Sequence, residues 1–399
     1  MLYVVKPAVL IPDVQTRAQL AALRSLGVAG YDTHAVSDSP SAMGLRSSYA
    51  LHRARHPAYS DPSFCDWLRA YCEQHAIKMI VPSAGILEAV RREFSAFKPL
   101  LPVADDPQVV FRANDKVATY ECWRANGLLE HHPLTIVATH GEAFDLSAFP
   151  APIFIKGGQG FDGETPGEGF HSCSSVELAD RTIHEMHDAG YSKVLVQGGV
   201  TGRQVCVSLL MGASGALAAN VVVDCHAEPH SKGTMSLRRT HWLQDVFEDA
   251  VRRLRALQWM GCAMVEYRRD DETGAFNVIE VNARFWQYLH LDLHAGVDFP
   301  RLLAEWFLEG RDPEPIAPKQ GLVCRDTFPG EFAQLVDALR RPAGRSRALI
   351  GFLSRFFDPR IYSDLNFRGD RMIFYSEFVK FLRSEIVGLG RRLHRTAKA

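Results

Sequence analysis

The feature that most constrains this chain is a predicted β-hairpin, GCAMVEYRRDDETGAFNVIEVNAR, which starts at Gly261 and carries a glutamate in each of its two strands, Glu266 and Glu280. Its outer segments are rich in residues that favour strands, and DDETG between them is typical of a turn. A hairpin centred on Thr273 places Glu266 directly opposite Glu280. Facing carboxylates on neighbouring strands destabilise a sheet, and apolar residues flank Glu280, so water alone explains the pair poorly. We therefore expect a cation between the two carboxylates.

The residues that follow Glu280 extend this charged face. Side chains on a strand alternate between its two faces, so Asn282 and Arg284 point to the same side as Glu280. Oxygen ligands of this kind suit Mg²⁺, or Mn²⁺ as an alternative, held by a few carboxylates together with substrate phosphates. The sequence predicts Glu266, Glu280 and Asn282 as metal ligands, with Arg284 binding phosphate in bidentate fashion. The alternative is a solvated sheet face with an incidental arginine.

A glycine-rich segment follows a second predicted strand, APIFIK, which ends at Lys156. Gly158, Gly160 and Gly163 match the spacing G-x-G-x-x-G, but the residues after them cannot open the helix that a dinucleotide site requires. A flexible glycine loop can instead close over a nucleotide triphosphate while the preceding lysine neutralises phosphate charge. The alternative is a plain surface loop.

A second lysine lies at a position where its charge does not stabilise the predicted helix. Asn114 is a predicted N-cap for a helix that runs to about Asn126. Lys116 then lies in the first turn, where a positive charge opposes the helix dipole. This placement indicates a functional role for Lys116.

Composition and patterning set the broad class. Among 399 residues, 47% are hydrophobic and 23% are charged, with a formal net charge of -1, which gives no indication of a nucleic-acid partner. Strands alternate with helices over about residues 1–110, which predicts an open parallel α/β domain. The eight cysteines contain no C-x-x-C spacing, which argues against a zinc site or disulfide framework. A signal peptide and a long apolar run are both lacking, so we expect a cytoplasmic protein.

The C-terminal part of the chain is basic. Residues 340–399 contain 14 Lys and Arg against 5 Asp and Glu. The segment FYSEFVKFLRSEIVGLGRRLHR combines apolar and basic residues at the spacing of an amphipathic helix. Two interpretations stay open: docking on the rest of the protein with a solvated basic face, or contact with an anionic membrane or carrier partner.

Taken together, Lys116, Lys156, the glycine loop and the pattern Glu266…Glu280-x-Asn282-x-Arg284 resemble the ATP-grasp superfamily. The similarity is greatest to its carboxylate–amine ligases related to carbamoyl phosphate synthase, and EVNARFWQYLHLDLHAGVDFP is the most specific part of it. The resemblance implies an α/β protein with a Rossmann-like pre-ATP-grasp domain and an ATP-grasp fold of two α+β subdomains. The implied ranges are 1–110 for the first domain, 111–310 for the ATP-grasp domain with its lid subdomain over about 111–190, and 311–399 for a mainly helical C-terminal extension.

The resemblance also implies residue roles. Glu266, Glu280 and Asn282 bind Mg²⁺, Arg284 contacts the γ-phosphate and the acyl phosphate made from it, and residues 157–169 form the lid. The implied nucleotide contacts are Lys116, Lys156, Gly158, Gly160, Gly163, Gln197 and Gln204. The family usually has a glutamate that contacts adenine and a further acid that holds the ribose, and this chain has Gly198 and Gln204 at the aligned positions.

By the same resemblance the chain is an ATP-dependent, ADP-forming ligase that joins a small carboxylate to an amine, with amino acids among the candidates. The alternatives are a nucleotide-binding module without catalysis, an ATP- and bicarbonate-dependent carboxylase, or a kinase-like phosphotransferase. By position, candidates for binding an anionic substrate are Arg238, Arg239, His226 and Lys232, and candidates for lining its pocket are Tyr288 and His290. A surface role for these residues is the alternative.

Overall fold

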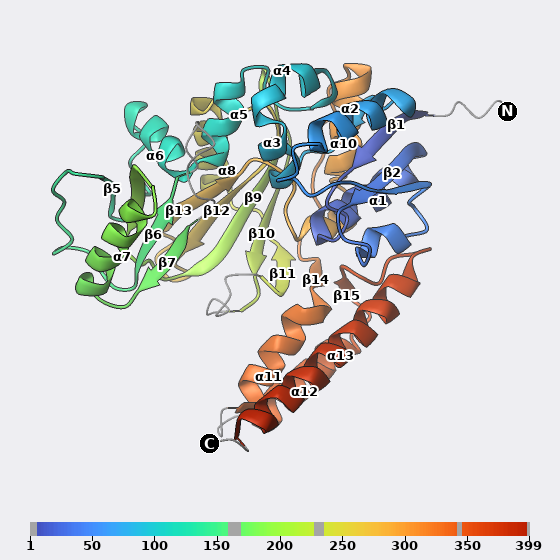
Figure 1. Ribbon diagram of the computed structural model, residues 1–399. Coiled ribbons are helices and arrows are strands. Elements are labelled where there is room, and N and C mark those ends of the chain that lie inside the picture. The colour runs from blue at the N-terminus through green and yellow to red at the C-terminus, as the bar shows by residue number, and fades with distance from the viewer. Residues whose placement is uncertain (1–5, 159–168, 227–234, 341–344, 397–399) are drawn as a thin grey trace.

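The N-terminal residues form a four-stranded parallel sheet with strand order β3-β2-β1-β4, which confirms the predicted α/β domain. The computed structural model describes residues 6–158, 169–226, 235–340 and 345–396 (Figure 1). The strands and helices of this part are β1 (Lys6–Ile11), α1 (Arg17–Val28), β2 (Tyr31–Ser37), β3 (His52–Arg55), α2 (Phe64–Gln74), β4 (Met79–Ile80), α3 (Ala84–Ala89), α4 (Phe94–Phe97) and α5 (Pro107–Asn114).

A second, antiparallel sheet of four strands follows, with order β5-β8-β6-β7. Its elements are α6 (Lys116–Ala125), β5 (Thr135–Thr139), β6 (Ile153–Gly157), β7 (Phe170–Cys173), α7 (Val176–Asp188) and β8 (Lys193–Gln197). The apolar side of α7 packs on this sheet through Ala179, Ile183 and Met186, because the three residues recur at helical spacing. This small sheet and its helices form the lobe at the left of Figure 1.

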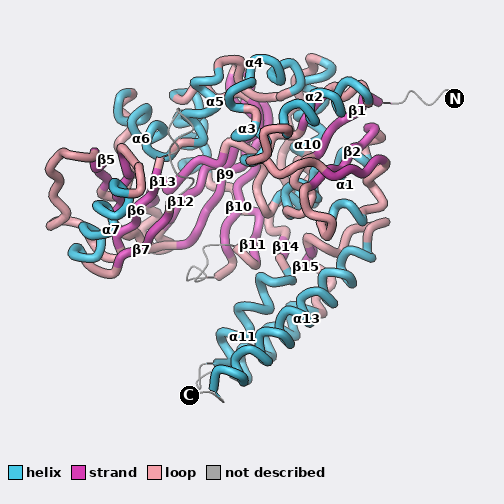
Figure 2. Tube along the Cα trace, viewed as in Figure 1, coloured by secondary structure: helices cyan, strands magenta, loops and turns pink. Residues whose placement is uncertain are grey.

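The largest sheet has seven strands in the order β13-β12-β9-β10-β11-β14-β15. Its elements, with the helices that follow the hairpin, are β9 (Arg203–Gly212), β10 (Gly215–Asp224), β11 (Leu237–Thr240), α8 (Gln244–Ala256), β12 (Gly261–Arg269), β13 (Phe276–Asn282), α9 (Leu289–Ala295), α10 (Phe299–Glu309), β14 (Val323–Arg325) and β15 (Ile361–Ser363). Figure 2 shows these strands running through the middle of the molecule. The C-terminal extension is therefore not only helical, because β14 and β15 complete the central sheet.

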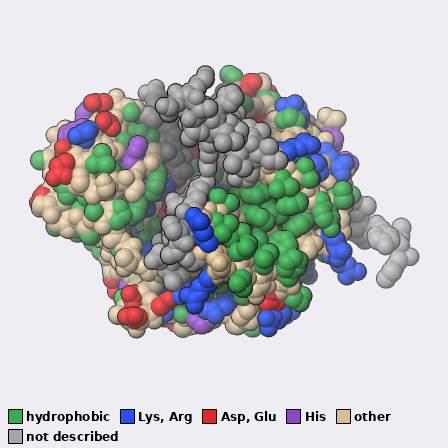
Figure 3. All heavy atoms as spheres, turned by 90° about the horizontal axis from the view of Figure 1, so that it is seen from below, with side chains coloured by type: hydrophobic (Ala, Val, Ile, Leu, Met, Phe, Trp, Pro, Cys, Tyr) green, Lys and Arg blue, Asp and Glu red, His purple; other side chains and the backbone are tan. Residues whose placement is uncertain are grey.

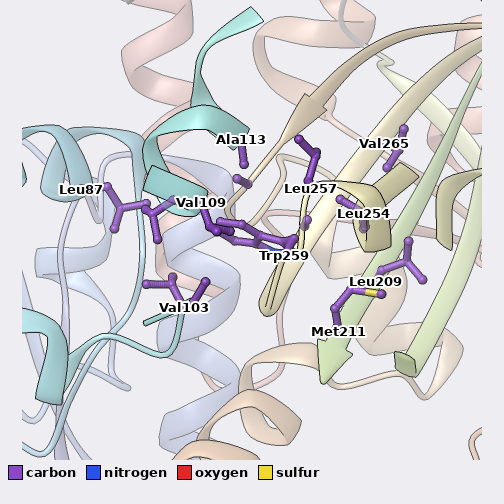
Figure 4. Close-up of a cluster of buried hydrophobic side chains, with 14 of the residues drawn as sticks. Leu87, Val103, Val109, Ala113, Leu209, Met211, Leu254, Leu257, Trp259 and Val265 are labelled. Carbon is purple, nitrogen blue, oxygen red and sulfur yellow. The ribbon is translucent and has the colours of Figure 1, made fainter. Parts of the chain in front are cut away.

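One hydrophobic core joins the first sheet's helices to the central sheet. Figure 4 shows Leu87 and Val109 on one side of Trp259, and Leu254 and Val265 on the other. All five side chains are buried. This continuous packing holds the two parts together, because apolar area buried between them is removed from water.

The remaining helices form a C-terminal arm, which projects from the body in Figure 1. They are α11 (Phe332–Arg340), α12 (Arg345–Phe356) and α13 (Arg371–Thr396). Phe332 of α11 contacts both Phe352 of α12 and Phe381 of α13, so aromatic packing holds the three helices. Among the described residues, none of the helices combines the length and the apolar character needed to cross a membrane.

Candidate active site

The hairpin of β12 and β13 pairs Glu266 with Glu280, as a hairpin centred on Thr273 predicts. The strands, however, do not pair in one continuous register around Thr273. Tyr267 pairs with Val278, so the register shifts by one residue at Ile279 before Glu280 meets Glu266. A β-bulge of this kind inserts one extra residue and re-aims the side chains beyond it. Without the bulge, Glu280 would point to the opposite face of the sheet.

The predicted metal ligands meet in one pocket of about 200 Å³. Asn282 Nδ2 donates a hydrogen bond to Glu280 Oε1 at 3.1 Å, which directs the amide of Asn282 toward the carboxylate pair. The complete lining of the pocket is Gln204, Cys206, Met235, Met264, Glu266, Glu280, Asn282, Arg284, Trp286, Gln287 and Tyr288. The three predicted metal ligands and the guanidinium of Arg284 therefore share one hollow.

The two predicted lysines flank Glu280 from different elements. Asp115, not Asn114, caps helix α6, because its carboxylate accepts the backbone N–H of Ala118 at 2.8 Å while Asn114 ends the preceding helix. This cap places Lys116 at the first helical position, where its Nζ lies 3.8 Å from Glu280 Oε2. Lys156 is buried near the end of β6, and its Nζ donates to the backbone oxygen of Ile279 at 3.4 Å.

The pKa values of Glu266 and Glu280 are shifted in opposite directions. Burial and the neighbouring charge of Glu280 raise the pKa of Glu266 to about 7, although Arg268 and Lys156 act in the opposite direction. Burial also raises the pKa of Glu280, but Lys156 and Lys116 outweigh it, and the pKa of this carboxyl is lowered. A divalent cation fits this donor set, because it would neutralise two partly buried like charges and could be coordinated by the amide oxygen of Asn282.

This asymmetry predicts a pH-dependent stability. A carboxyl whose folded pKa lies above its unfolded value favours folding at low pH, and that contribution is lost as the pH rises through the folded pKa of about 7. In metal-free buffer we expect Glu266→Gln to unfold at a higher urea concentration than the wild type at pH 8, and at about the same concentration at pH 5. Equal midpoints at pH 8 would contradict the proposed repulsion between Glu266 and Glu280.

The structure describes only part of the predicted nucleotide-binding region. Gln197, Lys116, Tyr120 and Glu280 help to line a narrow pocket on the α6 side of the hairpin. Gly158 lies against the start of α6, where an added Cβ would be 3.1 Å from the carboxylate of Asp115. Gly160 and Gly163, and with them most of the predicted lid, lie outside the described residues.

Gly198 and Gln204 depart from the family pattern for different physical reasons. Gly198 donates its N–H to Leu134 O at 2.8 Å, and a Cβ at this position would lie 2.8 Å from Pro150 Cδ. No side chain fits there without a shift of Pro150. Gln204 lies in the pocket, where its hydrogen bond lowers the pKa of Glu266 after the larger effects of burial and charge. Gln204 thus contacts Glu266.

Some of the predicted substrate contacts lie elsewhere. Arg238 is fully buried and pairs with Asp364 of the C-terminal extension, so it is a structural residue and does not face the pocket. His290 is also buried and bonds Arg24 at 2.9 Å, so it does not line the pocket, whereas Tyr288 does. The remaining candidates are Arg239, which is exposed on β11, His226, which bonds Ser236 at 3.3 Å, and Lys232, which lies outside the described residues.

Arg268 is a neighbour of the predicted metal ligands that the motif does not indicate. Its Nη2 lies 3.8 Å from Glu266 Oε1, and its Nη1 is buried without a hydrogen-bond partner among the described residues. An unpaired buried guanidinium nitrogen is costly and favours an anionic partner. Strand alternation could have identified Arg268, because it lies two residues after Glu266 on the same strand and therefore on the same face.

Gln287 connects the site to a second, larger hollow of about 740 Å³. This hollow lies between the body and the C-terminal arm, and Pro329 and Phe381 are among its apolar lining residues. Its complete lining is Gln15, Thr16, Arg17, Met43, Gln287, Asp326, Phe328, Pro329, Gly330, Ala333, Glu377, Lys380 and Phe381. One exposed glutamine is thus shared by two adjoining spaces.

Comparison with solved structures identifies the fold. No protein-family model matches the chain, and no curated protein matches its sequence. Among solved structures, biotin carboxylase from Campylobacter jejuni in its βγ-ATP complex has a TM-score of 0.61 at 14% identity, over 79% of this chain and 74% of that one. L-amino acid ligase from Bacillus licheniformis has a TM-score of 0.58 at 14% identity, over 76% and 74%.

The ADP complex of N5-carboxyaminoimidazole synthetase from Staphylococcus aureus has a TM-score of 0.57 at 13% identity, over 79% of this chain and 80% of that one. These neighbours are ATP-grasp enzymes. At such low identity the likeness concerns the fold alone, and it agrees with the fold expected from the hairpin and glycine-loop motifs. The chain has the ATP-grasp fold.

Proposed function

We propose that this protein is an ATP- and Mg²⁺-dependent ligase that activates a carboxylate as an acyl phosphate and couples it to an amine, with release of ADP. The observation that carries the proposal is the opposed pair Glu266 and Glu280, flanked by Lys116 and Lys156 and sharing a pocket with Arg284. Neighbours of the same fold include an amino acid ligase and a carboxylase. Phosphoryl transfer requires positioning and charge neutralisation more than a covalent nucleophile, and this donor set supplies both.

The residues divide the work as follows. Glu266, Glu280 and Asn282 would hold Mg²⁺, which supplies positive charge to the phosphate oxygens. Lys156 and Arg284 bind the phosphates, so that a substrate carboxylate oxygen attacks the γ-phosphorus as the bond to ADP breaks. The amine nitrogen then attacks the acyl carbon, inorganic phosphate leaves with the bonding electrons, and the amine gives up a proton as the amide forms.

Product analysis tests this proposal. With ATP, Mg²⁺ and panels of acids and amines, we expect ADP and phosphate in equal amounts, only when both an acid and an amine are present. AMP and pyrophosphate as products would contradict the mechanism. ATP cleavage that depends on bicarbonate alone would identify a carboxylase instead. If calorimetry detects no ATP binding with Mg²⁺ present, the result would favour a module that does not bind nucleotide.

Lys156→Ala should mainly weaken ATP binding. A hydrogen bond to a charged group contributes about 1.5–3 kcal/mol, so the dissociation constant should rise by about one to two orders of magnitude. Isothermal titration with a non-hydrolysable ATP analogue measures this change. Lys193→Ala is the matched control, because Lys193 lies on the neighbouring strand β8 and pairs with Glu121 at 2.8 Å away from the pocket. Equal affinities of the two variants would count against a phosphate role for Lys156.

The larger hollow suggests where one substrate binds. Its apolar lining, which includes Pro329 and Phe381, would accept the hydrocarbon part of an acid or amine, while Gln287 would lie at the passage to the reacting groups. We therefore infer a substrate that combines a polar reacting end with an apolar body. A panel of acids and amines of rising chain length measures this preference, and kcat/KM that falls steadily with chain length would contradict it.

A further inference from the structure

Exposed hydrophobic side chains concentrate on the C-terminal arm. Of the fifteen large hydrophobic residues that are exposed in the described chain, nine lie between Leu349 and Leu382. Figure 3 views the molecule from the side on which the arm projects, and it shows a broad area of hydrophobic side chains there with Lys and Arg beside it. Contiguous apolar surface of this kind marks an interaction site.

Two helices present these residues at helical spacing. On α12 and just beyond it, the exposed residues are Leu349, Ile350, Leu353 and Phe357. On α13 they are Met372, Tyr375, Val379 and Leu382. The opposite side of α13 is already occupied, because Ile373 is buried and Phe378 contacts Phe328. Each helix therefore has an outer apolar stripe in addition to the face that holds the arm together.

The charge around these stripes is of one sign. The exposed charged residues between 345 and 383 are Arg345, Arg347, Arg360, Arg368, Arg371, Lys380 and Arg383. None of the Asp and Glu side chains within this described range is exposed: Asp364, Asp370 and Glu377 are buried, and Asp358 is partly buried and pairs with Arg360. The surface is thus apolar and basic together.

We propose that the C-terminal arm binds the surface of an anionic lipid membrane, with the outer stripes of α12 and α13 in the interface and the basic residues at the lipid headgroups. Amphipathic helices that combine Leu, Phe and Ile with Lys and Arg lie in the plane of such interfaces. A second copy of the chain fits the surface less well, because a symmetric contact would bring identical basic arms together.

This inference goes beyond the ligase reaction and stands on different residues. It also bears on the position of the larger hollow. Lys380 and Phe381 of α13 line that hollow, and Val379 and Leu382 of the same helix are exposed. Binding of the arm would bring the hollow close to the lipid surface. A substrate with an apolar body would then reach Gln287 from the membrane.

Vesicle flotation with the full-length protein tests the proposal. Wild-type protein should float with vesicles of phosphatidylcholine that contain about a third phosphatidylglycerol, and much less with phosphatidylcholine alone, because a surface of basic residues is attracted to anionic headgroups. The double variant Ile350→Asp/Phe357→Asp should bind at least about tenfold more weakly, since it places charge in the apolar interface. The two side chains are 67% and 76% exposed, so the changes remove no packing contact of the core.

The matched control is Val28→Asp/Leu51→Asp, two side chains of the body that are 64% and 63% exposed. This control should bind vesicles as the wild type does. Wild-type protein that fails to float with anionic vesicles would overturn the proposal, and so would an arm variant that floats as well as the control. A wild-type dimer that the arm variant converts to a monomer, without vesicle binding by either, would assign the surface to a second copy instead. ADP release in solution reports on the ligase proposal separately.

Discussion

Replacement of Glu280 by glutamine removes turnover while the protein stays folded. The glutamine keeps the size of the side chain and can still bond Asn282, which lies 3.1 Å away in the wild type. It loses the negative charge that faces Lys116 and Lys156 and that would hold the cation. Electrostatic groups of this kind contribute a factor of about a hundred to a thousand each, so kcat should fall by at least that much.

The measurement is ADP release under saturating ATP and Mg²⁺, together with circular dichroism to check the fold. Glu272→Gln is the matched control, since Glu272 is exposed in the turn of the same hairpin. That variant should keep the wild-type rate. A Glu280→Gln protein with a near wild-type rate would refute the metal assignment.

The second large effect concerns stability. Asp370→Asn should destabilise the protein by about 3–5 kcal/mol, because it leaves the guanidinium of Arg24 buried without its counter-charge. Asp370 Oδ2 accepts from Arg24 Nε and from Ser47 Oγ, each at 2.8 Å, and both charged side chains are almost fully buried. This pair ties α1 of the first domain to the segment that leads into α13, so the loss should reach the whole C-terminal arm.

Urea unfolding followed by tryptophan fluorescence measures this change. The control is Asp358→Asn, which removes an ion pair with Arg360 at the protein surface, where such pairs contribute little. Asp358→Asn should leave the midpoint unchanged. If the two variants unfold at the same urea concentration, the buried pair does not hold the arm to the body.

Local rules predict the N-terminal α/β domain and the side chains that meet in the pocket, whereas the ATP-grasp fold is implied by the resemblance of the motifs. Strand alternation places Asn282 and Arg284 beside Glu280, and the turn composition brings Glu266 opposite. The bulge at Ile279 is not readable from spacing, since one inserted residue can be accommodated at several positions of a strand. The turn of the hairpin is not centred on Thr273, and the bulge compensates for this displacement, so a count from Thr273 still gives the correct pairing.

Long-range pairing explains the remaining differences. Arg238 looks like a substrate contact because a polar stretch surrounds it, but its partner Asp364 is 126 residues later in the chain. Arg24 and Asp370 are separated still further. Motif spacing carries no information about such partners, and an arginine on a short polar strand gives no local sign that it is buried. Gly198 is similar, because the obstacle to a side chain there is Pro150 from another strand connection.

The position of β14 and β15 at the end of the central sheet also affects how the protein matures. Residues 261–282 leave the ribosome well before residues 323–363, so the hairpin of β12 and β13 can pair with β9 before β14 is available to pair with β11. An unpaired strand edge is a template for association with other chains. Strands β14 and β15, which are synthesised after the hairpin, therefore protect the nascent protein from aggregation, and truncation before Val323 should yield insoluble protein even though every proposed metal ligand is retained.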